Sequence, residues 1–486
     1  MSITRVNKQN SVKTSVASFH EVVDPATGRV VGSVQIADAL EVDDAVADAQ
    51  LAAHHWMRTS PKERSVILIR AAAIVRERLV AIAEVLTLEQ GKPLSDSKKE
   101  ILFGAKVLEY YGEEILRLAP DMRASENPDI RSIVRYAPIG VVGAIVPWNY
   151  PVDLWCWKVG PALAAGNVIV SKSPIEAPFA IGMMLDCLND AGLPENVLQD
   201  LPGGVPAGAA MAQHPGIGML SATCSTSAGR EIMRLASGSL KRLTLELGGS
   251  SPFIVLRDAD IENAAQAALR RSFSNAGQIC IAVNRIIVED DVADDFVTAM
   301  ADLMNDMRLG NGSDPDVEYG PVTTKAVIRT TESHLSDALT RGAKLIRGGK
   351  KLQGANFDGG LFYAPTLIDH TPRDADVFNH ETFGPLAAVH RVYDAREALE
   401  VANDSVYGLA AYVYSNDLEK AWSLAERLEC GGVGVNVNDV SELQAPFGGW
   451  KLSGYGRELG KEGLLGFMNS QHIKLRVKNQ FLDREI

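Results

Sequence analysis

Residues 167–200 read NVIVSKSPIEAPFAIGMMLDCLNDAGLPENVLQD and predict a unit of strand, helix and strand. The apolar run Val168–Ser171 predicts the first strand, and a helical pattern follows it to about Ala191. Gly192-Leu193-Pro194 ends the helix, and the second strand is expected near Val197. A helix between two such strands is typical of a parallel sheet with helices on its faces.

The same alternation continues toward the C-terminus. The expected elements are a helix at 207–213, a strand at 217–221, a helix at 225–236, strands at 243–246 and 253–256, a helix at 259–273, a strand at 285–288 and a helix at 293–307. The chain is expected to pass from one unit to the next near residues 246–251. We therefore predict an α/β fold with two parallel-sheet units.

The N-terminal region is expected to be helical. Ser60-Pro61-Lys62-Glu63 supplies an N-cap, a proline at the first helical position and a capping-box glutamate, and apolar residues at a spacing of three or four continue to Gly91. Between 133 and 146 the residues favour β structure but are interrupted by Pro138-Ile139-Gly140, which predicts two short strands or one bent strand.

Composition limits the possible partners. The chain has 486 residues and a formal net charge of −13, so it has no excess of basic residues to meet nucleic acid or an anionic membrane. The longest apolar run, Gly140–Pro147, is too short to span a bilayer. Five scattered cysteines without metal-ligand spacing predict reduced thiols, no metal site and a cytoplasmic location. The basic, serine-containing first twenty residues are faintly typical of a transit peptide, and we interpret them as a polar tail.

Two glycine clusters are similar to nucleotide-binding loops. The cluster at 454–460 follows Pro446-Phe447-Gly448-Gly449 rather than a strand, so we give it little weight. The other cluster begins at Gly203, between an expected strand and helix, and Ser225-Thr226 follows the next strand. Backbone amides and hydroxyls at such helix starts can hold an anion, which favours a dinucleotide phosphate site.

Two residues are candidates for catalysis. Cys280 ends the stretch Asn275-Ala276-Gly277-Gln278-Ile279-Cys280, whose small residues allow close approach of a ligand. Glu246 ends an apolar strand directly before Leu247-Gly248-Gly249, at the strand end where open α/β sheets bind ligands. Taken singly, a lone cysteine is most often a small buried hydrophobe, and a glutamate at a strand end is most often a solvated acid.

Together these stretches resemble the paired active-site signatures of the NAD(P)-dependent aldehyde dehydrogenase superfamily. Further matching motifs in the same order are Pro147-Trp148-Asn149-Tyr150-Pro151, Lys158-Val159-Gly160-Pro161-Ala162-Leu163, His214-Pro215, Glu381-Thr382-Phe383-Gly384-Pro385 and residues 446–454. The resemblance runs from about Asp24-Pro25 to the last strand.

The resemblance implies a mechanism through covalent catalysis. Cys280 would attack the aldehyde carbon as a thiolate, and the side chain of Asn149 with the backbone N–H of Cys280 would stabilise the oxyanion. Hydride transfer to the nicotinamide would leave a thioester, and Glu246 would activate the water that hydrolyses it. Glu246 is also a candidate base for the thiol, and Lys158 completes the expected catalytic set.

The resemblance also implies a cofactor site. Lys172 is expected at the adenosine ribose or phosphate, Ser225 at the pyrophosphate, and Glu381 and Phe383 at the nicotinamide ribose and ring. The other expected cofactor residues are Pro147, Trp148, Gly203 and Gly248. Where NAD-preferring relatives commonly carry a glutamate, this chain has Ile175, so the cofactor is expected to be NAD or NADP, with NAD slightly preferred.

Three further departures from the family pattern concern turnover. Cys224 replaces a glycine near the nicotinamide end, Ser250 replaces a lysine, and Asn469 stands where a glutamate is often found. We interpret them as changes in cofactor pose or proton relay. The alternative is a cofactor-binding protein with impaired turnover.

The expected substrate is a small-molecule aldehyde. By analogy, its tunnel is lined by an apolar and aromatic set that favours aliphatic or aromatic aldehydes: Tyr150, Leu154, Trp157, Ile279 and Ile281. Semialdehyde-specific relatives often carry an arginine where this chain has Ser274, which disfavours an anionic substrate, although a semialdehyde dehydrogenase remains the alternative. The presence of Glu246 argues against acyl transfer to coenzyme A or phosphate.

The family architecture gives the expected domains. Residues 20–126 and 148–247 would form the cofactor domain, 248–445 the catalytic domain, 127–147 and 470–486 an oligomerisation arm, and 446–469 a segment returning to the cofactor domain. An exposed arm strand would pair with another subunit, so a homodimer or homotetramer is expected.

Overall fold

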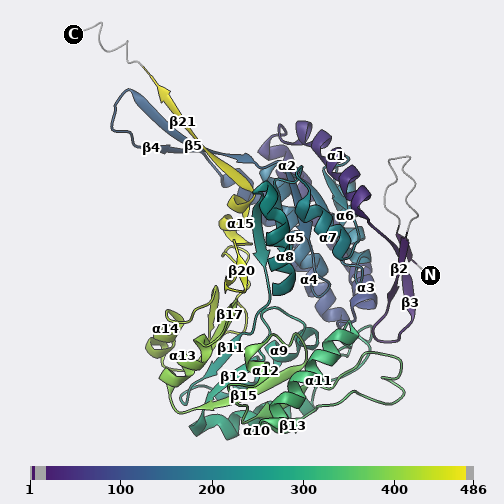
Figure 1. Ribbon diagram of the computed structural model, residues 1–486, viewed down its shortest axis with the longest axis vertical. Helices are drawn as coiled ribbons and strands as arrows, with labels where there is room; N and C mark the ends of the chain where they lie inside the picture. Colours follow the sequence, from purple (N-terminus) through teal and green to yellow (C-terminus); the bar gives the residue numbers. More distant parts are fainter. Residues whose placement is uncertain (1–2, 6–17, 478–486) are drawn as a thin grey trace.

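The computed structural model describes residues 3–5 and 18–477 of the chain. Two large α/β units lie one above the other in Figure 1, and a narrow β arm extends away from the upper unit. Residues 6–17 of the expected N-terminal tail and the last arm residues at 478–486 lie outside the described residues. Residues 3–5 and 18–20 of that expected tail lie in β-strands instead. Within the described ranges, no helix is both long enough and apolar enough to cross a membrane.

The first unit is built on a six-stranded sheet with the order β20-β10-β9-β6-β7-β8. Its strands are β6 (Val141–Ile145), β7 (Val168–Lys172), β8 (Leu198–Asp200), β9 (Met219–Thr223), β10 (Arg242–Glu246) and β20 (Gly454–Tyr455). All neighbours are parallel except β20, which joins β10 in the antiparallel direction. Every residue of β6, β7 and β9 is buried, as expected for a parallel sheet covered on both faces.

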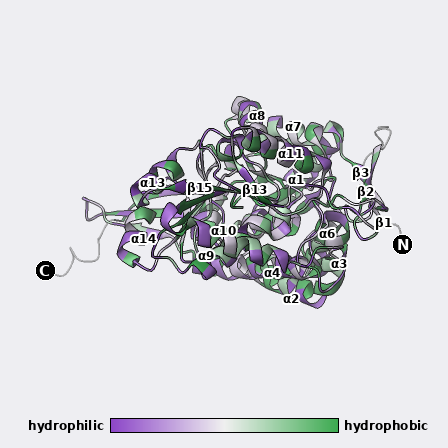
Figure 2. Ribbon diagram, turned by 90° about the horizontal axis from the view of Figure 1, so that it is seen from below, coloured by the Kyte–Doolittle hydropathy of each residue, from purple (hydrophilic) through white to green (hydrophobic). Residues whose placement is uncertain are grey.

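Helices cover this sheet. They are α1 (Ala39–Trp56), α2 (Pro61–Glu77), α3 (Leu79–Gln90), α4 (Leu94–Arg117), α5 (Pro151–Ala165), α6 (Phe179–Asp190), α7 (Val205–Gln213), α8 (Thr226–Ala236) and α15 (Gly460–Gly466). In Figure 2, α2 and α4 alternate between hydrophilic and hydrophobic colours, as helices with one buried face do.

The prediction of a single helix from Ser60 to Gly91 is wrong in one respect, because the structure has two separate helices, α2 and α3. The Ser60 capping box and the left-handed C-cap at Gly91 form as predicted. Arg78 interrupts the helix with φ −95° and ψ 8°, and its guanidinium is 2.6 Å from Asp190 on α6. The break is therefore accompanied by a tertiary contact, and no proline or glycine marks it.

The second unit contains a seven-stranded sheet with the order β13-β14-β15-β12-β11-β17-β18, in which only β13 is antiparallel to its neighbour. Its strands are β11 (Pro252–Val255), β12 (Arg285–Glu289), β13 (Lys344–Arg347), β14 (Thr366–Asp369), β15 (Leu386–Val392), β17 (Ala410–Tyr414) and β18 (Gly432–Val435). Its helices are α9 (Ile261–Phe273), α10 (Asp290–Asn305), α11 (Lys325–Thr340), α12 (Asp376–Asn379), α13 (Ala395–Asn403) and α14 (Leu418–Ala425). The prediction of two parallel-sheet α/β units is confirmed.

Three small sheets complete the described fold. The N-terminal sheet has the order β1-β3-β2, with β1 (Ile3–Arg5), β2 (Ser18–Val23) and β3 (Val30–Ile36), and a two-stranded sheet joins β16 (Tyr407–Gly408) to β19 (Trp450–Lys451). The arm has the order β21-β5-β4, with β4 (Asp121–Arg123), β5 (Ile130–Pro138) and β21 (Met468–Arg476).

The expected arm segment 127–147 needs correction. Only β5 belongs to the arm, whereas β6 lies in the middle of the six-stranded sheet. The chain turns between them at Gly140, whose φ of +123° favours glycine. The physical reason is burial, because all of β6 is buried while every residue of β5 keeps some exposure.

The carboxyl ends of four parallel strands meet at one edge of the first sheet. Ile145 is in register with Lys172 and with Ala222, and Thr223 is in register with Glu246. The segments that leave these strands carry most of the expected site residues. This edge is where open α/β sheets bind ligands.

Candidate active site

The loop that contains Cys280 has a strained entry. A 3-10 turn, Ser274–Gly277, follows α9, and three of its residues have left-handed backbone angles: Asn275 (φ 48°), Ala276 (φ 55°) and Gly277 (φ 74°). Such angles cost on the order of 1 kcal/mol or more for a residue with a side chain. The surrounding structure must therefore hold the turn in place.

Buried hydrogen bonds hold it. Asn275 accepts a bond from Nε2 of Gln90 at 2.9 Å and donates from Nδ2 to the backbone oxygen of Asn149 at 3.0 Å. A Cβ at Gly277 would lie 2.3 Å from the backbone oxygen of Gly384, so only glycine fits. The Cys280 loop is thus fixed from both units of the chain.

Asn149 lies between β6 and α5 and contacts this loop directly. Its Nδ2 donates to the backbone oxygen of Gln278 at 3.0 Å. Its own backbone oxygen accepts from Nζ of Lys92 at 2.7 Å, and Lys92 pairs with buried Glu100 at 2.5 Å. Because an amide nitrogen carries two hydrogens, one N–H of Asn149 remains for another acceptor.

Glu246 ends β10 with its carboxylate buried. Neither of its side-chain oxygens has a hydrogen-bond partner among the described residues. Burial raises the pKa of Glu246 well above its usual value, and the nearby Glu458 carboxylate raises it further, while Lys158 and Arg457 act in the opposite direction. An unpartnered buried carboxyl with a raised pKa is suited to accept and release a proton.

Lys158, whose charge acts on Glu246, pairs with Glu458, a residue that was not predicted from the sequence. Nζ of Lys158 donates to Oε1 of Glu458 at 2.7 Å and to the hydroxyl of Thr223 at 2.7 Å. Glu458 lies inside the glycine cluster 454–460, where Gly456 and Gly460 both have positive φ. That cluster forms the turns around a buried glutamate, and the need of buried Lys158 for an anionic partner was the available signal.

The thiol of Cys280 is half-buried, and its surroundings favour the protonated form. Burial raises its pKa to about 12, with further contributions from the negative charges of Glu246 and Glu381. Attack as a thiolate therefore requires a base or a change in the charges around the sulfur.

The cofactor residues predicted from the first unit gather at its sheet edge. Nζ of Lys172, at the end of β7, donates to the backbone oxygen of Gly203 at 2.7 Å. Ser225 is the N-cap of α8 and accepts from the backbone of Ala228 at 3.3 Å. Burial lowers the pKa of Lys172, and Glu176 is the strongest of the neighbouring charges that counteract this shift.

The second unit contributes its predicted pair opposite this edge. Oε1 of Glu381 accepts from the backbone of Gly249 at 3.0 Å, and burial raises the pKa of Glu381 to about 7. The ring of Phe383 meets that of Trp148 edge to face, with centroids 5.6 Å apart. Pro147 and Trp148 lie directly after β6 and remain half-buried.

These residues fit a dinucleotide. Lys172 supplies a cation, exposed Ser225 and the start of α8 supply donors, and Glu381 keeps Oε2 free of any described hydrogen bond. A Cβ at Gly248 would lie 2.4 Å from that Oε2, so the glycine leaves Glu381 in its place. The set offers cation, donor and acceptor to the phosphates and riboses of such a cofactor.

The three departures from the family pattern lie in different surroundings. Cys224 is half-buried in this cleft, and burial raises the pKa of its thiol to about 12. The buried hydroxyl of Ser250 has no partner among the described side chains and backbone groups. Asn469 lies on β21, where its Oδ1 accepts a hydrogen bond from Arg242 at 3.3 Å.

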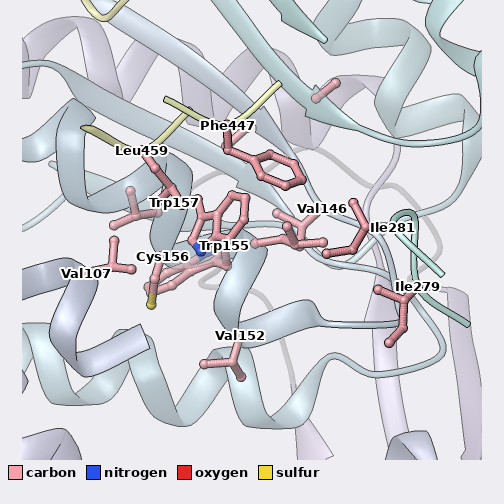
Figure 3. Packing of buried hydrophobic residues seen from close by; sticks show 14 of the residues in the cluster. Val107, Val146, Val152, Trp155, Cys156, Trp157, Ile279, Ile281, Phe447 and Leu459 are labelled. Carbon is pink, nitrogen blue, oxygen red and sulfur yellow. The ribbon is translucent and has the colours of Figure 1, made fainter. Parts of the chain in front are cut away.

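The predicted substrate residues and Cys280 belong to, or pack against, one large apolar cluster. Leu154, Trp157, Ile279 and Ile281 are buried in one apolar cluster, and half-buried Tyr150 packs against it. Figure 3 shows Trp157 and Ile281 in this cluster together with Phe447, which belongs to the matching motif 446–454 but is not among the predicted substrate residues. The Trp157 and Phe447 rings meet edge to face with centroids 5.0 Å apart.

Comparison with known proteins shows one family throughout. The aldehyde dehydrogenase family model matches residues 12–473. The glutarate-semialdehyde dehydrogenase of Pseudomonas aeruginosa is 38% identical over 456 residues, covering 94% of both chains, and an Escherichia coli succinate-semialdehyde dehydrogenase [NADP(+)] is 38% identical over 454 residues, covering 93% of both. The crystal structure of an E. coli NADP-dependent enzyme matches with a TM-score of 0.92 and 38% identity, covering 95% of each chain.

Proposed function

The chain belongs to the aldehyde dehydrogenase family and oxidises an aldehyde to the carboxylic acid with NAD(P)⁺, and on that premise we propose roles for its site residues. Cys280 is the nucleophile that bonds to the aldehyde carbon. The free N–H of Asn149 and the backbone N–H of Cys280 stabilise the oxyanion that forms. The bond between Asn149 and Gln278, two residues before Cys280, supports this assignment.

Glu246 acts as the base for the hydrolytic step. It takes a proton from the water that attacks the thioester of Cys280, and its raised pKa makes the carboxylate a stronger proton acceptor. Lys158 and Glu458 form a buried ion pair. The two charges have fixed positions, and both act on the pKa of Glu246. We assign Lys158 and Glu458 as positioning residues that set the proton affinity of Glu246.

The cofactor is held by both units. Lys172, Gly203 and Ser225 hold its adenosine and phosphate end, and Gly248, Glu381 and Phe383 its nicotinamide end, with Pro147 and Trp148 lining the cleft. When bound, NAD(P)⁺ would supply the hydride acceptor for the aldehyde carbon bonded to Cys280. Glu176 supports a modest preference for NAD⁺, since its charge near Lys172 would repel a 2′-phosphate, although the E. coli relative named above is an NADP⁺ enzyme.

The substrate we propose lacks a distal carboxylate. Tyr150, Leu154, Trp157, Ile279 and Ile281 provide apolar and aromatic surface beside Cys280. A semialdehyde substrate is the second candidate, favoured by the names of the two curated relatives. Arg271, one helical turn before Ser274, is the cation nearest to that position in sequence, but Asp439 already pairs with it at 3.1 Å.

The remaining proposals concern assembly and location. Among the described residues, β21 pairs with a strand on one side only, and its exposed apolar side chains support pairing with a second copy of the chain. All five cysteines are free thiols, which supports a reducing, cytoplasmic location.

The observation that carries the catalytic proposal is the unpartnered buried carboxylate of Glu246 near Cys280. The test is pre-steady-state formation of NAD(P)H with a simple aldehyde. Cys280→Ala should form none, whereas Glu246→Gln should release about one equivalent per site and then stall at the thioester. Sustained turnover by Glu246→Gln would contradict the assignment.

A further inference from the structure

Asp153 is the exception in helix α5. Fourteen of the fifteen residues in this helix are buried, and only Asp153 keeps an accessible part of its side chain. Oδ1 accepts a hydrogen bond from Nε1 of Trp157 at 2.8 Å. The amides that open the helix do not need Asp153, because Oε1 of Glu100 accepts from Val152 and Asp153. The carboxylate is therefore not explained as a helix cap.

Asp153 has no ion pair among the described residues. Burial raises its pKa well above the usual value, and the charges of Glu100 and Asp439 add to this shift. Lys92 is the one cation that opposes the shift, but Glu100 and the Asn149 backbone already engage its ammonium. A carboxylate buried without a cation is costly, so a cation supplied by a ligand would be stabilised there.

The helix places this carboxylate on the substrate side. Asp153 and Trp157 are four residues apart in α5, which puts them on one face with about 6 Å of rise between them. Asn149, the proposed oxyanion donor, lies two residues before the helix, on the N-terminal side of Asp153. Trp157 and its neighbour Phe447 contribute aromatic rings on the C-terminal side. A chain of a few carbons held at Cys280 would carry its far end past Asp153.

We propose that Asp153 recognises the end of the substrate distal to the aldehyde and selects a cationic tail, with the rings of Trp157 and Phe447 beside it. The inference rests on the proposed roles of Asn149 and Cys280. An ammonium group would meet both a carboxylate and aromatic faces, which attract cations. A carboxylate tail would meet negative charge from Asp153, and the nearby cation Arg271 is already paired with Asp439.

The test compares aldehydes that differ in tail charge. We would measure kcat/KM for 4-(trimethylammonio)butanal, for its uncharged isostere 5,5-dimethylhexanal and for 5-oxopentanoate, using the wild type and Asp153→Asn. The asparagine keeps an oxygen that can accept from Trp157 and removes the charge. In the wild type, kcat/KM for the cationic aldehyde should exceed that for its isostere by about tenfold or more. Such a ratio is expected for one favourable contact between the ammonium group and the site. Asp153→Asn should lose this preference, keep turnover of the isostere within about twofold and improve 5-oxopentanoate.

The matched control is Asp96→Asn, which removes a carboxylate whose charge acts on Tyr150 and which pairs with exposed Lys99. It should leave the ratio of kcat/KM for the cationic and isosteric substrates nearly unchanged. Equal wild-type rates for the cationic and isosteric aldehydes would overturn the proposal, as would an equal loss for all substrates in Asp153→Asn. Failure of the catalytic proposal looks different, because then no aldehyde, including the isostere, would be turned over through Cys280.

Discussion

Nζ of Lys158 lies 2.7 Å from Oε1 of Glu458, although 300 positions separate the two residues in the sequence. Both side chains are fully buried, and Ser221 donates to the same glutamate oxygen at 3.0 Å. The two charges act on Glu246 in opposite directions, since Glu458 raises its pKa and Lys158 lowers it. Burial raises the pKa of the proposed base most, and a pair drawn from distant parts of the chain then adjusts it.

Replacing Glu458 by Gln should shift the pH dependence of turnover. The substitution removes the charge that raises the pKa of Glu246 and leaves Lys158, which lowers it, so Glu246 should ionise at lower pH. We expect the acidic limb of kcat against pH to move down by about one unit or more, as for the loss of a close like charge. Ser221→Ala, which removes only a neutral hydrogen bond to Glu458, is the control and should shift the limb less. An unchanged or upward-shifted limb would show that Glu458 does not act on the base.

The reactivity of Cys280 should rise steadily with pH in the enzyme without cofactor. Because its pKa is raised to about 12, alkylation by iodoacetamide should increase from pH 7 to 10 without a plateau. Glu246→Gln removes a charge that raises this pKa, so at pH 8 it should alkylate several-fold faster. Mass spectrometry of the labelled peptide identifies the site, with Cys280→Ala as the blank. A plateau near pH 7 in the wild type would mean that the thiolate is already formed.

The sequence predicts the reacting residues better than it predicts the residues that position them. Cys280 and Glu246 stand in short local motifs, so their neighbours along the chain reveal them. The role of Glu458 is not visible in the sequence, because its partner Lys158 is 300 positions away. The glycines around Glu458 are similar to a nucleotide-binding loop, which draws attention away from the glutamate. The break at Arg78 lacks a glycine or proline, and its contact with Asp190 exists only in the folded chain.

The same limit applies to the strands. The apolar residues of β6 predict a buried strand, but they do not predict which sheet the strand joins. The arm expected at 127–147 therefore includes β6, which lies in the six-stranded sheet. The order of strands depends on which buried faces meet, and this information is tertiary. The parallel α/β class was predictable because it follows from the alternation of elements alone.

Gly248→Ala should weaken cofactor binding without unfolding the protein. The new Cβ would lie 2.4 Å from Oε2 of Glu381, the far end of a side chain that can move aside. We expect the KM for NAD⁺ to rise about tenfold, equivalent to about 1.4 kcal/mol, with a nearly unchanged melting temperature. Gly249→Ala is the contrasting variant, because its Cβ would lie 2.3 Å from the backbone oxygen of Cys280 and should impair both activity and stability. Equal behaviour of the two variants would argue against the role of Glu381.

Cofactor preference should respond to the charge at Glu176. This residue is the strongest of the neighbouring charges that raise the pKa of Lys172, so its carboxylate acts on the same region of the cleft. Glu176→Gln should raise the ratio of kcat/KM for NADP⁺ to that for NAD⁺ by about tenfold, because a like charge no longer faces the 2′-phosphate. Ile175→Glu should lower the ratio by adding an acid at the neighbouring position. If neither variant changes the ratio, these two positions do not contact the adenosine end.

The arm should be required for assembly. Ile473, Leu475 and Val477 alternate along β21 and its end, and all three are exposed by more than a third, which leaves one apolar strand face uncovered. Antiparallel pairing with β5 occupies one edge of β21, and its other edge has no strand partner within residues 18–477. A second copy that pairs at this edge would satisfy the backbone groups and cover the apolar face together.

The double variant Ile473→Lys, Leu475→Lys should therefore sediment as a monomer where the wild type sediments as a dimer or tetramer, while its circular dichroism remains that of the folded chain. Lysines at the exposed residues Val80 and Leu102, on helices α3 and α4, add the same charge elsewhere and should leave the sedimentation unchanged. A monomeric wild type, or a double variant of unchanged mass, would show that the arm does not hold the subunits together.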